Sequence, residues 1–353
     1  MNTPKEKLTE PKKKVLGYIG LIILFFFLSF GSFYVLHRKF SGGSLNIPVQ
    51  LFSFPIIASL LGLLLCYYLA DALRLYSVIK AMGCKVPFRY IFKLVFINIF
   101  ISNVTPFATG GGFVQIYFMS KKGMTIGEAT AATSIRTILS AMILFTLTPI
   151  IIWAEPNQFK MFMNRNMLLG ITIASCTVLF FLLLITFWPQ VIKHILGGIL
   201  YIPKTLKWKV AIHLESFNER VGKEIDSFSK GFKHYFRFGG LWAVCSVAST
   251  ILFLFFLFSF SIVLIKALGY TIPFLTILAV QVVVTFFMYF APTPGATGIA
   301  EGGYGLLFAQ LVQNKDILAL TFSWRFLTIY IGVIIGIFIF AGEFFKMKKE
   351  MPK

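Results

Sequence analysis

The sequence predicts an all-α integral membrane protein with six transmembrane helices and two re-entrant helical hairpins, arranged as inverted-topology repeats. Its 353 residues are 58% hydrophobic and only 13% charged, which is too apolar for a soluble domain. Several apolar runs are long enough to cross a bilayer as helices. The same landmarks also recur in the same order in two halves of the chain, and such duplication is typical of membrane transporters.

Six apolar runs predict the transmembrane helices, because the hydrocarbon core of a bilayer takes roughly 20 helical residues to cross. The first run is too long for a secretory signal and lacks a small-residue cleavage site, so it counts as a span. No alternating β-barrel pattern occurs. The runs are Val15–Leu36, Leu51–Ala70, Ala129–Ala154, Met167–Trp188, Gly240–Ile265 and Ile317–Phe340.

An internal repeat relates the two halves. The segments I-K-A-M-G-C-K-V-P-F (79–88), T-P-F-A-T-G (105–110) and S-I-R (134–136) recur as I-K-A-L-G-Y-T-I-P-F (265–274), T-P-G-A-T-G (293–298) and S-W-R (323–325). The offsets are 186, 188 and 189 residues. A chance match in apolar sequence would repeat only apolar residues, whereas here Thr, Pro, Gly, Lys and Arg also match. We expect one membrane domain, 1–353, with repeat one at 51–153, a cytoplasmic amphipathic linker at 189–239 and repeat two at 240–345.

Charge predicts the orientation. The net charge of +20 lies in loops between spans, which indicates the positive-inside rule rather than nucleic-acid binding. The apolar stretch Tyr90–Met119 is broken at Asn103–Gly112, and only a re-entrant hairpin there keeps the nine Lys and Arg of loop 189–239 cytoplasmic. The stretch Phe274–Leu311, broken at Ala291–Gly303, then enters from the opposite face. Both termini are expected on the cytoplasmic side of the cell (inner) membrane.

The two tips are the first candidate substrate site. Glycine lets the chain turn, proline fixes the break, and helix N-termini that follow the tips would point positive ends at an anion. The structural alternative is that the glycines only permit close helix packing. The candidate residues are Thr105, Pro106, Thr109, Gly110, Gly111, Gly112, Thr293, Pro294, Gly295, Thr297 and Gly298, with Gln115 and Asn103 as weaker candidates that suit polar packing.

Charged residues inside apolar spans are the second candidate. Arg136 and Arg325 occupy equivalent repeat positions, and a charge at mid-membrane costs at least ~2.5–3.5 kcal/mol, so both are predicted to bind a lipid phosphate. The alternatives are an internal ion pair of Arg325 with Glu301 and snorkelling of Arg136. Glu301 itself could balance an arginine, bind a cationic headgroup or carry a proton. Asp71 and Arg74, at a predicted span end, suit an interfacial pair and an entry gate equally.

The loop 189–239 carries an amphipathic pattern. Its apolar stripe is Leu214, Phe217, Val221, Ile225, Phe228 and Phe232, and Lys223, Lys230 and Lys233 lie opposite. Such a helix is predicted to lie on the inner membrane surface, with partner binding as the alternative.

Several kinds of site have no support in the sequence. Four scattered cysteines (Cys66, Cys84, Cys176 and Cys245) and four unclustered histidines predict no metal, no cofactor and no disulfide. No Walker loop, nucleophile elbow, dinucleotide fingerprint or exposed Asp-x-Asp is present.

The segments N-V-T-P-F-A-T-G-G-G with the following S-K-K-G, the Ala-rich Gly127–Arg136, and A-P-T-P-G-A-T-G-I-A-E-G-G carry a resemblance over nearly the whole chain. On them the chain resembles the flippase-like membrane family related to the lysylphosphatidylglycerol synthase transmembrane region, the flippase half of the multiple peptide resistance factor. The resemblance implies flipping of a lipid such as aminoacylated phosphatidylglycerol, a place in lipid metabolism of the cell envelope, and antibiotic resistance. Two departures are Gln115, where many members carry an acidic residue and Arg, and an end at Lys353 without a soluble aminoacyl-transferase domain.

We therefore expect a transporter, rather than an enzyme, that moves a phospholipid or polyprenyl-type lipid between leaflets. A membrane-embedded transferase, phosphatidylglycerol lysyltransferase-like or acting on a lipid-linked sugar, is the first alternative. An accessory protein of envelope synthesis is the second. A membrane lipid is the expected partner, and a homo-oligomer and a lipid-synthesising enzyme partner are left open.

Overall fold

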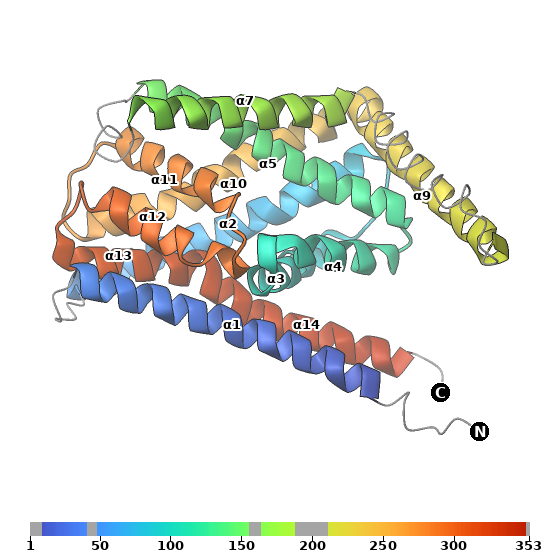
Figure 1. Ribbon diagram of the computed structural model, residues 1–353, viewed down its shortest axis with the longest axis horizontal. Coiled ribbons are helices and arrows are strands. Elements are labelled where there is room, and N and C mark those ends of the chain that lie inside the picture. Colours follow the sequence, from blue (N-terminus) through green and yellow to red (C-terminus); the bar gives the residue numbers. More distant parts are fainter. Residues whose placement is uncertain (1–8, 41–47, 155–163, 188–210, 351–353) are drawn as a thin grey trace. The chain divides into compact units, whose positions relative to one another are not determined.

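The computed structural model describes residues 9–40, 48–154, 164–187 and 211–350, and these ranges contain helices and no strands (Figure 1). Within these ranges six helices are long and apolar enough to cross a membrane, and they overlap all six predicted runs. The predicted all-helical class and the six candidate spans are thereby confirmed. The spans are Gly20–Phe40, Phe54–Ala81, Ile126–Ala154, Arg165–Leu184, Gly240–Ala267 and Asn314–Lys346.

Most of the helices follow apolar runs, and several end within two residues of a glycine or proline, namely Gly83, Pro106, Gly239 and Gly269. Four short elements separate or interrupt them, namely the 3₁₀ turns η1 (Val49–Phe52), η2 (Pro106–Ala108) and η3 (Pro294–Ala296) and the π-helical segment η4 (Phe326–Tyr330). The α-helices are α1 Thr9–Phe40, α2 Phe54–Ala81, α3 Phe88–Val104, α4 Thr109–Ser120, α5 Ile126–Ala154, α7 Arg165–Phe187, α9 Ala211–Phe238, α10 Gly240–Ala267, α11 Phe274–Met288, α12 Ile299–Phe308, α13 Asn314–Arg325 and α14 Ile331–Glu350.

Helix bounds correspond between the two halves. Both ends of α2 and α10 differ by 186 residues, as do the first residues of α3 and α11. The turns η2 and η3, and the first residues of α5 and α13, differ by 188. The order α2, α3, η2, α4, α5 therefore recurs as α10, α11, η3, α12, α13.

Equivalent loop contacts accompany these bounds. The Tyr270 hydroxyl, after α10, donates a 2.6 Å hydrogen bond to Asp316 in the first turn of α13. At the equivalent place after α2, the Cys84 thiol lies against Glu128 of α5. Burial and the neighbouring carboxylate raise the pKa of Cys84 to about 11, and the same two causes raise the pKa of Tyr270. Each half thus fastens a loop to the first turn of the helix that carries its buried arginine.

The four helices around the breaks are short. With 17, 12, 15 and 10 residues, α3, α4, α11 and α12 fall below the roughly 20 that a crossing takes. α3 and α4 run antiparallel, because the Tyr90 hydroxyl donates to the Phe118 carbonyl at 3.2 Å and the Gln115 amide to the Leu94 carbonyl at 3.3 Å. α11 likewise packs against α12.

The chain forms two compact units. The first contains Met1–Leu64, Phe96–Gly111 and Phe258–Lys353, and the second contains Leu65–Val95 and Gly112–Leu257. In the first unit η2 packs against η3, and α1 packs against α12 and α13. In the second unit α5 packs against α7 and α9.

The amphipathic helix α9 covers protein in its described part. Phe232 is 1% exposed, the Glu224 carboxylate accepts a 2.5 Å hydrogen bond from the Gly127 amide at the start of α5, and Gly231 adjoins Ala131. The prediction that this face lies on the membrane surface is therefore wrong for Phe232, because α9 packs against α5 and Phe232 is buried within the protein. Leu214, Phe217 and Val221 lie outside the residues whose side chains are described, and residues 188–210 lie outside the described part of the chain.

Candidate functional site

The two helix breaks share one backbone conformation in their 3₁₀ turns. They differ directly after the turns, where Thr109 is helical and Thr297 is extended. Pro106 and Pro294 each begin a 3₁₀ turn, and the following residue is left-handed in both, with φ 53° and ψ 18° at Phe107 and φ 61° and ψ 19° at Gly295. Proline starts the break because it cannot donate to the preceding turn. A left-handed conformation costs a residue with a Cβ atom about 1–2 kcal/mol, so glycine suits position 295 and Phe107 is strained.

The breaks are shorter than predicted. Helix resumes at Thr109 in the first tip and at Ile299 in the second, so Gly110–Gly112 and Gly302–Gly303 are helical. The prediction of irregular backbone through Gly112 and Gly303 is wrong.

Close packing explains two of these glycines. A Cβ atom on Gly110 would lie 2.6 Å from the methyl group of Thr105, and one on Gly111 would overlap the Ser102 hydroxyl and lie 2.8 Å from the Asn98 carbonyl oxygen. Both contacts are between α4 and the end of α3. The packing alternative therefore accounts for Gly110 and Gly111.

Replacing Gly111 with Ala is expected to lower the free energy of unfolding by about 1–3 kcal/mol, because the new methyl group must displace Ser102 or the α3 backbone. Gly112→Ala is the matched control, since a Cβ atom there meets no described atom within 4 Å. Thermal unfolding of the purified variants measures both. Equal melting temperatures for the two variants would contradict the packing role.

Hydroxyl groups hold the tips. Thr105 donates to the Ile101 carbonyl at 2.8 Å and accepts from the Gly110 amide at 3.0 Å, and Thr109 donates to the Pro106 carbonyl at 3.1 Å. In the second tip Thr297 donates to the Pro294 carbonyl at 2.6 Å, and Thr293 donates to the Thr297 carbonyl at 2.8 Å. These four threonines satisfy carbonyl groups that the breaks leave without helical partners.

Arg325 is paired inside the second tip. Its Nε donates to Glu301 at 2.7 Å and its Nη2 to the Gly295 carbonyl at 2.8 Å, and both charged residues are 0% exposed. The other carboxylate oxygen of Glu301 accepts a 2.7 Å hydrogen bond from the Gly298 amide, so it caps α12. The ion-pair alternative for Arg325 is confirmed, and the chain's own carboxylate occupies the positive end of α12.

A second charged cluster lies in the other unit. The predicted span-end position of Asp71 and Arg74 is wrong, because the candidate span continues to Ala81 and keeps both residues inside the helix. They are 3% and 5% exposed. Arg136 lies ten residues into α5 and is 8% exposed, so snorkelling to a helix end does not describe it.

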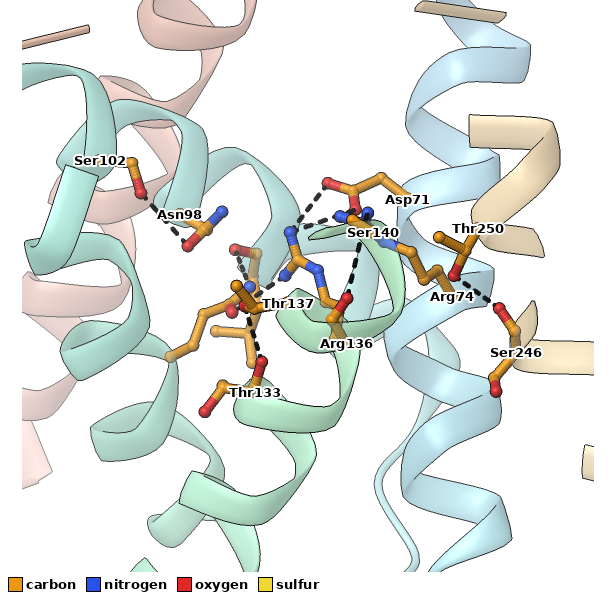
Figure 2. Close-up of polar contacts among 12 residues, drawn as sticks. Asp71, Arg74, Asn98, Ser102, Thr133, Arg136, Thr137, Ser140, Ser246 and Thr250 are labelled. Atoms are coloured by element: carbon orange, nitrogen blue, oxygen red, sulfur yellow. Dashed lines mark hydrogen bonds and ion pairs between the residues drawn. The ribbon is translucent and has the colours of Figure 1, made fainter. Parts of the chain in front are cut away.

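Asp71 is shared by two guanidinium groups (Figure 2). Arg74 Nη2 lies 2.6 Å from its carboxylate and Arg136 Nη2 lies 3.2 Å from it. Arg136 also donates to the Gln115 side-chain oxygen at 3.0 Å, and Arg74 donates to the Ser140 hydroxyl at 2.5 Å. The sequence-predicted residues Asp71, Arg74, Arg136 and Gln115 thus come together in one buried site, which we call the Asp71 cluster.

Two residues that contact the Asp71 cluster, Ser140 and Phe253, were not predicted from the sequence. Ser140 lies one helical turn after Arg136, a spacing that predicts a shared face. The centre of the Phe253 ring lies 4.0 Å from the Arg74 guanidinium carbon. No spacing within one helix predicts this contact, because Phe253 belongs to α10. Asn103 donates to the Ile99 carbonyl of its own helix at 2.7 Å, which confirms polar packing.

Residues 15–336 match the family described as Lysylphosphatidylglycerol synthase TM region. The chain belongs to this family. It is a multi-pass membrane protein by that membership and by its six candidate spans. Among curated relatives of this family member is a UPF0104 membrane protein of Archaeoglobus fulgidus, 25% identical over 76% of this chain and 81% of the relative. A second, from Pyrococcus horikoshii, is 25% identical over 75% of this chain and 80% of its own length.

Proposed function

We propose that this family member is a lipid flippase that moves a phospholipid or polyprenyl-type lipid between the leaflets of the cell membrane. Repeat one (51–153) and repeat two (240–345) have inverted topology in this proposal, and the hairpins α3–α4 and α11–α12 re-enter from opposite faces. Residues 189–239 and both termini are cytoplasmic, as the distribution of Lys and Arg favours. Alternating access follows if each hairpin opens the pathway toward its own face.

The observation that carries the proposal is the contact of η2 with η3. Two 3₁₀ turns of one conformation, which break helices too short to cross, pack together within one unit. Non-helical backbone at membrane depth is tolerated only beside protein or a water-lined cavity, and broken helices that meet at mid-membrane are the usual binding region of secondary transporters.

The family description supports a lipid as the transported molecule, because it names the membrane region of a protein that makes a lipid. Aminoacylated phosphatidylglycerol is therefore one candidate. A lipid-synthesising enzyme and a second copy of the chain are the partners that we propose. The tip residues, which lie in the first unit except for Gly112, and the Asp71 cluster, in the second, are each proposed to contact the headgroup.

A reconstitution experiment tests the transport function. Purified protein in liposomes is expected to speed the leaflet exchange of fluorescent phosphatidylglycerol, measured by chemical quenching of the outer leaflet, with no change in the mass of the lipid. Protein-free liposomes and liposomes with an unrelated membrane protein are the controls. Exchange at the control rate together with a lipid of altered mass would replace the flippase with the membrane-embedded transferase.

The inverted topology is testable by labelling. In a background with the four cysteines replaced by Ser, a cysteine at Lys121 is expected to react with an impermeant maleimide only from the cytoplasmic side, and one at Asn314 only from outside. Both positions are exposed, and they follow the first hairpin and the second hairpin respectively. Labelling of both from one side would contradict the opposed hairpins.

A further inference from the structure

The two arginines that are equivalent in sequence have different charge environments. Arg325 faces one carboxylate, that of Glu301, so its ion pair is neutral. In the Asp71 cluster one carboxylate faces two guanidinium groups, those of Arg74 and Arg136, which gives the cluster a net charge of +1. The duplicated arginine is therefore balanced in one unit and part of a charge excess in the other.

The charge excess cannot be cancelled by a nearby acid of the same helices. Asp71 is the only acidic residue of α2, α3, α4 and α10. The one acid of α5, Glu128, lies eight residues before Arg136 and accepts the Thr125 amide at 2.8 Å. A buried excess cation is costly in a low-dielectric surrounding unless an anion joins it.

The cluster also has a free hydrogen-bond donor. Arg74 is 5% exposed, and its Nε finds no hydrogen-bond partner among the described residues. Arg325 Nη1 has none there either, but its ion pair is neutral. The two Nη groups of Arg74 are taken by Asp71 and Ser140, and Phe253 lies 4.0 Å from the guanidinium carbon. The cluster thus lacks one negative charge and at least one acceptor, and a single bound anion would supply both.

We propose that the Asp71 cluster binds the phosphodiester monoanion of a lipid headgroup through Arg74 and Arg136, and that Arg325 takes no part in this binding. The assignment rests on the proposed lipid transport and narrows its substrate class. A phosphodiester carries one negative charge, so the cluster with a bound phosphodiester is neutral. A neutral complex favours passage of the headgroup through the hydrocarbon core. A diphosphate-linked isoprenoid carries more charge and would leave the cluster negative. Guanidinium groups also match phosphate oxygens in pairs.

Binding to the purified full-length chain tests the assignment. The probes are short-chain phosphatidylglycerol, the diacylglycerol that lacks its phosphate, farnesyl diphosphate, and glycerophosphoglycerol, which has the phosphodiester without acyl chains. We expect phosphatidylglycerol to bind most tightly, because only this probe combines the monoanion with the chains. Tighter binding of farnesyl diphosphate would overturn the monoanion assignment, and equal binding of glycerophosphoglycerol would overturn the lipid source.

Arg136→Gln is the decisive variant. It is expected to weaken phosphatidylglycerol binding on the order of ten- to a hundredfold and to leave diacylglycerol binding unchanged. Folding is expected to survive, because Asp71 keeps Arg74 at 2.6 Å and the cluster becomes neutral. Arg136→Lys keeps the charge but loses the planar guanidinium group, so its affinity for phosphatidylglycerol is expected to lie between those of wild type and Arg136→Gln. Arg237→Gln on exposed α9 is the matched control for a lost positive charge and should bind as wild type does.

Two outcomes would overturn the proposal. One is an Arg136→Gln protein, folded by its melting curve, that binds phosphatidylglycerol as tightly as wild type. The other is an equal loss of binding in the neutral double variant Glu301→Gln/Arg325→Gln, which would assign the phosphate to the second tip. Leaflet exchange is measured separately, so the two proposals can fail independently. Binding that Arg136→Gln weakens, without any leaflet exchange, would support the site and refute the flippase. Leaflet exchange that Arg136→Gln leaves unchanged would support the flippase and refute the site.

Discussion

Arg325→Gln is expected to lower the free energy of unfolding by about 3–5 kcal/mol, because it removes the cation that balances a buried carboxylate. Glu301 is 0% exposed, and without Arg325 it keeps only the Gly298 amide as a described donor. The Gly295 carbonyl also loses its 2.8 Å hydrogen bond, so the second tip loses two of its fastenings. Thermal unfolding of the purified protein, followed by loss of the folded elution peak, measures the effect.

The double variant Glu301→Gln/Arg325→Gln separates charge from packing. A neutral amide at both positions leaves no stranded charge, and replacing a buried ion pair as a whole is often nearly neutral. We therefore expect the double variant to melt well above Arg325→Gln. If the two melt together, the carboxylate is not stranded in the single variant and the ion pair is not what stabilises the tip.

Gly295→Ala is expected to destabilise the protein by about 2–4 kcal/mol. Its φ of 61° is left-handed, which costs alanine about 1–2 kcal/mol. The new Cβ atom would also lie 2.8 Å from a ring carbon of Phe25 and 2.9 Å from the Asn103 side-chain oxygen, and such overpacking adds about 1–3 kcal/mol. Melting curves and the yield of folded protein measure the loss.

Phe107→Ala is the matched control, because it places the same residue in the same conformation of the other tip. Phe107 already has a φ of 53° and is 62% exposed, so its replacement adds no backbone strain and removes little packing. We expect a change within about 0.5 kcal/mol. A loss at Phe107 as large as that at Gly295 would contradict this explanation, because Phe107→Ala adds neither backbone strain nor a new contact.

Much of the candidate site could be predicted from single positions. Arg136, Arg325 and Glu301 stand out in apolar runs, since any charge there is costly, and Asp71 and Arg74 border one. Their partners could not be derived in the same way. Arg325 pairs with an acid 24 residues earlier, on α12, whereas Arg136 pairs with one 65 residues earlier, on α2. Equivalent positions in the repeat therefore predicted equivalent roles, and the surroundings differ because Phe113 stands where Glu301 stands in the second tip.

The six candidate spans, the positions of the two proline breaks and the family could all be predicted from the residues alone. The spans and breaks depend on local properties, namely the length of an apolar run and the inability of proline to continue a helix. The fold was needed to show how far each break extends, that Gly110 and Gly111 serve packing, that α9 covers α5, and that one carboxylate serves two arginines. Those outcomes depend on distances between helices remote in sequence, and neither hydropathy nor spacing contains such distances.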